Sequence, residues 1–97
     1  MTAVTIIARV EIAPEHADAF EAAYVTVAET VREEPGCIFY EGYRSQDQPT
    51  LFYFRECFAS ADAVEAHGEY PHMRQFFETV MPWVVDGPIA HRVKQLG

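Results

Sequence analysis

Two histidines in the second half of the chain could exchange protons at neutral pH. His67 and His72 stand five residues apart, and an unperturbed imidazole titrates near neutrality, which suits a general acid or base. His67 follows Ala63 and Val64 by four and three residues, so helical spacing places it on the face that these apolar residues turn inward. His72 follows Pro71, at a helix start that favours neutral imidazole and nearby anions. We predict both as catalytic residues, with His67 as the base and His72 as its support.

Each histidine also has a purely structural interpretation. His67 could be a buried ring that is hydrogen-bonded to a strand, and His72 could cap a helix or pack against it. A separation of five residues is about 500° around an ideal helix, so the two rings do not share a face. A chelated metal between them is therefore not expected, and we predict no metal site.

Aromatic side chains could form the walls of a pocket for an aromatic substrate. The predicted substrate-binding residues are Tyr40, Phe54, Phe76 and Trp83. Tyr40 and Trp83 each carry a polar group, whereas the phenylalanines could equally belong to the core. Glu56 lies among aromatic residues, where a carboxylate is buried only if it is paired. We expect an ion pair with Arg44 or Arg55, or a dimer contact, ahead of a role as a base.

Composition excludes several classes of function. The 97 residues predict one domain, 1–97. Seven basic and fifteen acidic residues give a net charge of −8, which repels nucleic acid. No apolar run of membrane-spanning length and no signal peptide are visible, so we expect a cytoplasmic protein with no membrane partner. The five glycines are isolated and predict no phosphate-binding loop for a dinucleotide. Cys37 and Cys57 are expected to be reduced thiols.

Hydrophobic periodicity predicts the elements that must position these residues. Residues 4–12 alternate and predict a strand with one buried face. From Ala17 the apolar residues recur at steps of three and four, which predicts a helix of about five turns that stops at the Pro-Gly pair 35–36. Residues 37–45 and 50–58 predict two strands joined by a turn. Ser60 predicts the N-cap of a helix that runs past His67. Gly68 and Pro71 are expected to break or kink this helix. A further helical segment ends at Pro82, and Gly87-Pro88 introduces a last strand over 89–96.

The order of these elements is β-α-β-β-α-β. It predicts a ferredoxin-like α+β fold, in which helices cover one face of a four-stranded antiparallel sheet. The run Leu51–Phe54 is apolar throughout, so alternate residues of this strand would face water unless the second face of the sheet is also covered. A second copy of the chain is the simplest cover, and we predict a homodimer.

Several short motifs resemble the antibiotic biosynthesis monooxygenase (ABM) family. They are Glu34-Pro35-Gly36-Cys37 with Tyr40, Arg44-Ser45, Pro49, Phe52, Glu56, Phe58, Ala66-His67, Pro71-His72, and Phe76 or Phe77. They extend from about Val10 to Phe77, and the order of elements agrees throughout. The resemblance implies a dimeric α/β barrel, in which two ferredoxin-like sheets pack face to face.

The family that the motifs resemble holds several chemistries. Some members oxidise quinols or anthrones with O2 and no prosthetic group, some degrade haem, and others isomerise or cleave the phosphorylated autoinducer-2 signal. Haem degradation is disfavoured. The resemblance to haem-degrading members would require an asparagine near Ala8 or Arg9 and a histidine ligand near Phe76–Phe77, and this sequence has neither. We expect a cofactor-free monooxygenase acting on a phenolic, hydroquinone or polycyclic aromatic substrate with O2. The alternatives are an isomerase or lyase for a small phosphorylated carbonyl compound, and a non-enzymatic dimer that binds a ligand.

Overall fold

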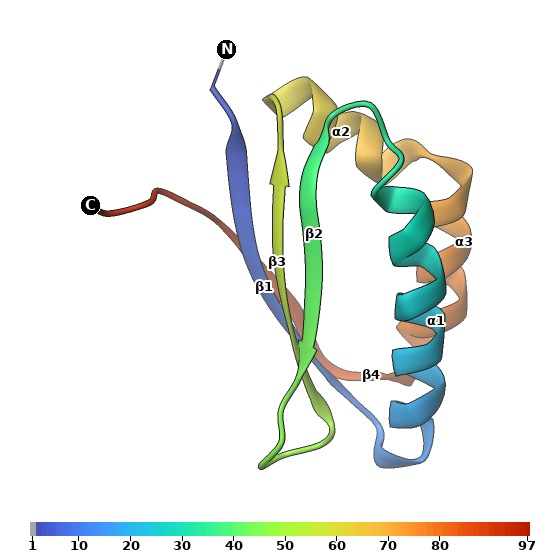
Figure 1. The fold of residues 1–97 in the computed structure, drawn as a ribbon. Helices are drawn as coiled ribbons and strands as arrows, with labels where there is room; N and C mark the ends of the chain where they lie inside the picture. The colour runs from blue at the N-terminus through green and yellow to red at the C-terminus, as the bar shows by residue number, and fades with distance from the viewer. Residues whose placement is uncertain (1) are drawn as a thin grey trace.

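A computed structural model describes residues 2–97 and confirms the ferredoxin-like fold (Figure 1). The elements are β1 (Val4–Ile12), a 3-10 turn η1 (Pro14–His16), α1 (Ala17–Val31), β2 (Cys37–Arg44), β3 (Leu51–Phe58), α2 (Ala61–Glu69), α3 (Pro71–Val80), a 3-10 turn η2 (Met81–Trp83) and β4 (Val84–Val93). The strands form one antiparallel sheet in the order β2-β3-β1-β4, and the helices cover one of its faces. No helix among the described residues is long and apolar enough to cross a membrane.

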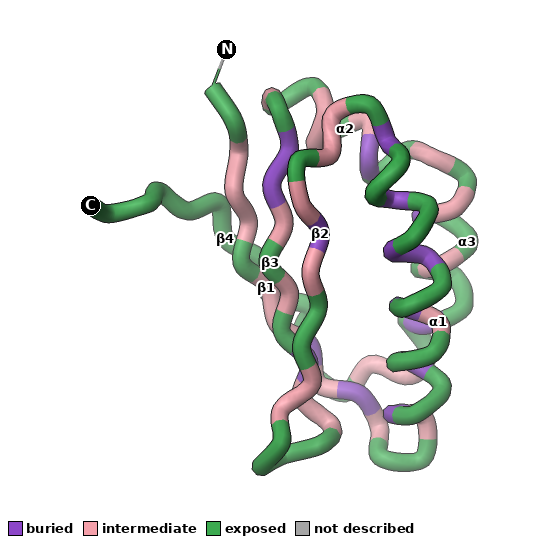
Figure 2. The backbone as a smooth tube through the Cα atoms, in the orientation of Figure 1, coloured by how far each residue is buried: buried purple, intermediate pink, exposed green. Residues whose placement is uncertain are grey.

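The core lies between this sheet and the helices α1 and α3. Alternation along β1 turns Val10 and Ile12 inward, where both are buried. On α1 the buried positions recur on the side that faces the sheet (Figure 2), as the helical spacing predicts. Phe20 of α1 packs on Phe52 of β3 with ring centroids 4.6 Å apart. Large side chains of α1 therefore pack directly on the middle strands of the sheet and hold the helix against it.

The predicted break between the second and third helices is confirmed. Ser60 caps α2 by accepting a hydrogen bond from the backbone N–H of Ala63 at 3.1 Å. Tyr70 is extended, with φ −63° and ψ 143°, because the residue before a proline avoids the helical region. The next helix begins at Pro71, so His67 and His72 belong to different helices. The angle of an ideal continuous helix therefore does not apply to them.

The last strand differs from its prediction. It begins at Val84 and ends at Val93, whereas the Gly-Pro pair predicted a start at residue 89. The pair lies inside the strand, beside a register shift between the pairs made by Arg9 and Glu11 of β1. Gly87 has a φ of +88°, and a Cβ there would lie 3.0 Å from the carbonyl oxygen of Arg9. Glycine thus allows the strand to bend and continue pairing where a turn was expected.

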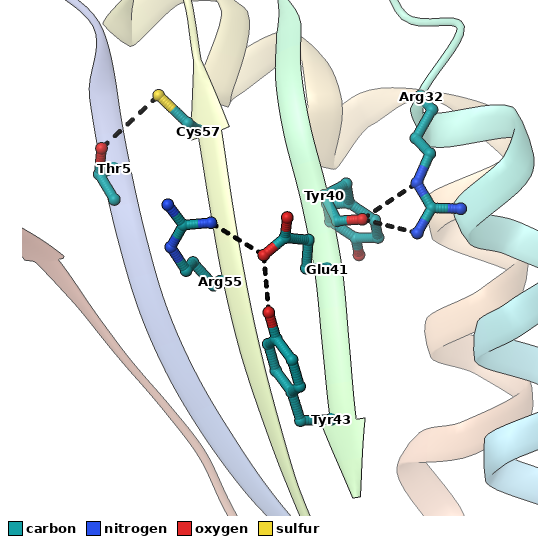
Figure 3. A network of polar contacts seen from close by, with 7 residues as sticks. All are labelled: Thr5, Arg32, Tyr40, Glu41, Tyr43, Arg55 and Cys57. Atoms are coloured by element: carbon teal, nitrogen blue, oxygen red, sulfur yellow. Dashed lines mark hydrogen bonds and ion pairs between the residues drawn. The ribbon is translucent and has the colours of Figure 1, made fainter.

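The second face of the sheet carries no helix and is a mixture of apolar and charged side chains. Ile7, Tyr43, Tyr53, Ile89 and Val93 are each between 40% and 54% exposed there. The guanidinium of Arg55 lies 4.0 Å from the ring centroid of Phe39. Arg55 donates to Glu41 at 2.8 Å, and Tyr43 donates to the same carboxylate at 2.7 Å (Figure 3). Apolar groups concentrated on one sheet face are typical of a surface that another protein covers.

Candidate functional site

A buried carboxylate links the two histidines. Nδ1 of His67 lies 3.0 and 3.1 Å from the two carboxylate oxygens of Glu34, and Nε2 of His72 lies 2.7 Å from one of them. The side chain of Glu34 is only 5% exposed and that of His67 11%. The two predicted catalytic histidines are therefore brought together through a third residue.

Local backbone geometry places Glu34 between the helices. It lies in the turn after α1, where its N–H bonds to the carbonyl of Val31 at 3.0 Å and its own carbonyl accepts from Cys37 at 3.0 Å. Gly36 lets α2 approach this turn, because a Cβ at that position would collide with the side chain of Ala63. The approach brings His67 of α2 within reach of Glu34.

The geometry suits His67 to accept a proton. An ionised carboxylate can only accept hydrogen bonds, so Nδ1 of His67 carries the proton in this pair. Nε2 then bears the lone pair, and no hydrogen bond involves it within residues 2–97. A carboxylate behind an imidazole fixes its tautomer and stabilises the imidazolium that forms when Nε2 takes a proton. His72, which bonds to the same carboxylate, holds Glu34 from the other side.

His67 lines a cavity of about 270 Å³ between the sheet and the helices. Its walls come from the inward faces of β1, β2, β3 and β4, from α1, α2 and α3, and from η2. They are mostly apolar; the lining residues are Ile6, Ala8, Val10, Phe20, Tyr24, Tyr40, Phe54, Glu56, His67, Gly68, Met73, Phe76, Phe77, Val80, Met81, Val84, Pro88 and Ala90. Such walls suit a flat apolar ligand with few polar groups.

Three of the four predicted substrate-binding residues line this cavity: Tyr40, Phe54 and Phe76. Tyr40 is anchored from outside by Arg32, whose guanidinium donates to the Tyr40 carbonyl at 3.1 and 2.8 Å (Figure 3). Trp83 is not among the lining residues. It stacks on His16 with ring centroids 5.1 Å apart, because η2 turns it toward the start of α1.

The expected ion pair of Glu56 is not formed. Arg55 points to the opposite face of the sheet and pairs with Glu41, and Arg44 pairs with Asp18 and Glu21 of α1. Within residues 2–97 no cation pairs with Glu56, which faces the cavity instead. Burial, with a smaller contribution from the negative charge of Glu34, raises the pKa of Glu56 to about 7.

Two tyrosines complete the polar part of the wall. The rings of Tyr24 and Tyr40 stack with centroids 5.5 Å apart. Burial is the main cause that raises the pKa of each phenol above its ordinary value, and the charge of Glu56 adds to it. Both phenols are therefore neutral donors at physiological pH. The hydroxyl of Tyr24 is buried and has no hydrogen-bond partner among the described residues.

Sequence reasoning missed Glu34 as a functional residue. The sequence points to Glu34 only within the motif Glu34-Pro35-Gly36-Cys37, and charged residues before a Pro-Gly turn are usually exposed. A tertiary contact across 33 residues leaves no local pattern. No group of three or more histidine, cysteine, aspartate or glutamate side chains among residues 2–97 has the arrangement of a metal site, and both cysteines are free thiols.

Known structures share this fold over nearly the whole chain. PA3566 from Pseudomonas aeruginosa is 26% identical with a TM-score of 0.91, and the match covers 100% of this chain and 97% of that one. Rv0793 from Mycobacterium tuberculosis is 24% identical with a TM-score of 0.89, covering 99% and 97%.

A curated relative and a family profile agree with these structures. The uncharacterised protein sll1783 from Synechocystis is 28% identical over 75 residues, which is 77% of this chain and 51% of that protein. This chain thus spans about half the length of that relative. The profile of the family described as antibiotic biosynthesis monooxygenase matches residues 3–79. The chain belongs to the antibiotic biosynthesis monooxygenase family.

Proposed function

We propose that this protein is a monooxygenase that needs no cofactor and oxidises a phenol, hydroquinone or polycyclic aromatic substrate with O2. One observation carries the proposal: His67, backed by the buried Glu34, stands at the wall of a largely apolar cavity. Family membership supports a monooxygenase-like activity. The aromatic walls supply the substrate class, because they match the faces of a flat ring system.

In the proposed reaction, Nε2 of His67 removes a proton from the substrate, and Glu34 stabilises the resulting imidazolium. The substrate anion gives one electron to O2, and the radical pair combines into a carbon–oxygen bond. The peroxide takes the proton back from His67. With anthrone, loss of the remaining C–H proton and cleavage of the O–O bond then convert the ring CH2 to a carbonyl. One oxygen atom of O2 stays in the product and the other leaves as water, which accounts for the four electrons.

The phosphorylated-carbonyl alternative is less well supported. Phosphate sites need arginine, lysine or converging backbone donors, and none of the residues that line the cavity is an arginine or a lysine. The negative charge of Glu34, which acts on the cavity residue Glu56, would also repel a phosphate. A ligand-binding dimer without catalysis remains as an outcome of the activity test.

Oxygen uptake by metal-stripped protein, measured against a panel of hydroquinones and anthrone, tests the activity. Replacing a general base typically costs about 10²–10⁴-fold in rate, so His67→Ala should lose that much of kcat, and His72→Ala less. His16→Ala is the matched control, since His16 stacks on Trp83 away from the cavity. Full turnover by His67→Ala on a substrate that the wild type oxidises would refute the base assignment; uptake with no member of the panel would favour the ligand-binding dimer.

We also propose that the protein is a homodimer in which the helix-free faces of the two sheets pack together. The exposed apolar groups of that face support this, including Ile7 and Tyr53, each 41% exposed. Sedimentation at micromolar concentration should give a particle of about twice 11.0 kDa. Ile7→Glu should shift it toward the monomer, whereas Val25→Glu on the exposed side of α1 should not. A stable wild-type monomer would contradict the proposal.

A further inference from the structure

Glu56 occupies a position in the cavity that the proposed proton transfer does not use. It lies on the helix-facing side of β3, between Ile6 of β1 and Tyr40 of β2 in the strand register. Phe54 and Phe58 flank it at the next positions on the same face. A carboxyl group among apolar and aromatic residues, without a cation, costs free energy, and a hydrogen bond to a bound ligand would offset part of that cost.

The Tyr24 hydroxyl is a second polar group with the same property. Tyr24 is 9% exposed, lines the cavity and has no hydrogen-bond partner for its hydroxyl among the described residues. Its ring lies against Tyr40 and Phe54, with centroids 5.5 and 5.1 Å away. Both are neighbours of Glu56 on the sheet. Buried hydroxyls are almost always hydrogen-bonded, so this one, on a residue that lines the cavity, has a hydrogen that it could donate to a ligand atom.

The charges around Glu56 favour its neutral form. Glu34 adds negative charge to the effect of burial, and together they raise the pKa of Glu56 to about 7. The titratable groups on the other elements around it are Tyr24 from α1, Tyr40 from β2 and His67 from α2. From β4, Arg92 is opposite Ile6 in register but is exposed and forms no ion pair with Glu56. At and below neutral pH, Glu56 and Tyr24 can therefore both donate a hydrogen bond.

We propose that Glu56 and Tyr24 form a specificity site, which donates hydrogen bonds to an uncharged acceptor oxygen of the ligand. Carbonyl oxygens and neutral phenolic oxygens fit the site. Carboxylates and phosphates bind poorly, because the cavity wall offers no arginine or lysine to a negative ligand and the negative charge of Glu34 opposes it. The choice of an aromatic ligand rests on the proposed function, but the polar preference follows from these two side chains alone.

Binding of α-tetralone tests the site without turnover. This compound carries one neutral carbonyl on an aromatic bicycle, and tetralin is the same skeleton without the oxygen. A net hydrogen bond corresponds to about three- to tenfold in affinity. We expect calorimetry at pH 6 to show α-tetralone binding tighter than tetralin by that factor, and the advantage to shrink by pH 8.5 as Glu56 ionises, which leaves only the contribution of Tyr24.

Variants separate Glu56 from the other groups that titrate. Glu56→Gln keeps the shape and a donor, so its preference for α-tetralone should persist at pH 8.5. Tyr24→Phe should lower the affinity for α-tetralone about threefold and leave the affinity for tetralin unchanged. Two results would overturn the site. One is a wild-type preference for α-tetralone over tetralin that does not change with pH, and the other is a preference in Glu56→Gln that falls between pH 6 and pH 8.5 as much as in the wild type. Oxygen uptake is measured separately, so failed catalysis with intact α-tetralone selection refutes only the proposed function.

Discussion

Replacing Glu34 by glutamine is the sharpest perturbation of the proposed catalytic unit. The glutamine amide has nearly the same shape and can accept a hydrogen bond through its oxygen while its NH2 donates to the other histidine. The neighbouring turn, fixed by backbone hydrogen bonds from Glu34 to Val31 and from Cys37 to Glu34, does not depend on the charge. We therefore expect the fold to be retained, with only the negative charge behind His67 removed.

The loss in rate follows from the geometry. Glu34 is 5% exposed on its side chain and lies 3.0 Å from Nδ1 of His67. A hydrogen bond to a charged group in such a setting contributes about 1.5–3 kcal/mol, and it matters most once His67 has become an imidazolium. Since about 1.36 kcal/mol corresponds to tenfold in rate, Glu34→Gln should lower kcat by about 10- to 10²-fold.

Oxygen uptake with the best substrate of the panel measures this loss, and Glu33→Gln is the matched control. Glu33 is the exposed neighbour, so its substitution removes the same charge without a histidine contact. Nitrogen chemical shifts of the His67 ring give a readout independent of substrate: Nδ1 should be protonated in the wild type, and the tautomer should become mixed in Glu34→Gln. A variant as active as Glu33→Gln, with an unchanged tautomer, would refute the role of Glu34.

Two further predictions concern stability. Gly42→Ala should destabilise the fold by about 1–3 kcal/mol, because a Cβ at this position would collide with the ring of Tyr24. Gly68→Ala is the control and should be neutral or stabilising, because nothing lies within 4 Å of its added Cβ. Urea unfolding compares the free energies of unfolding of the two variants, and equal effects would show that the contact with Tyr24 is absent. Burial raises the pKa of Glu56 in the folded state to about 7, above its ordinary value of 4.5, so the folded state binds more protons and stability should fall as pH rises from about 4.5 to 7. The glutamine of Glu56→Gln does not titrate, so the difference in free energy of unfolding between the wild type and this variant should change by about 2–3 kcal/mol across that range. Urea unfolding at several pH values measures it, and parallel pH profiles would contradict the prediction.

Local patterns determined most of the fold. Alternation over residues 4–12 and helical spacing from Ala17 predicted β1 and the start of α1 to the residue, because side-chain periodicity directly reflects which face of an element is buried. The break predicted at Gly68 and Pro71, which the structure places at Tyr70, and the cap at Ser60 were equally local, since proline geometry and capping act within a few residues. The start of β4 failed where the conformation of Gly87 depends on the approach of the β1 backbone.

The site divides in the same way. The sequence predicted His67 and His72 as site residues, and three of its predicted aromatic residues line the cavity, because imidazole chemistry and helical facing can be inferred from residue types and spacing. Only the tertiary structure decided that Glu34 joins the two histidines, and that Glu56 has no arginine partner. Both outcomes depend on which side chains meet across separate elements. Packing of α2 against the turn after α1 fixes the first, and the opposite facing of Arg55 and Glu56 along one strand fixes the second.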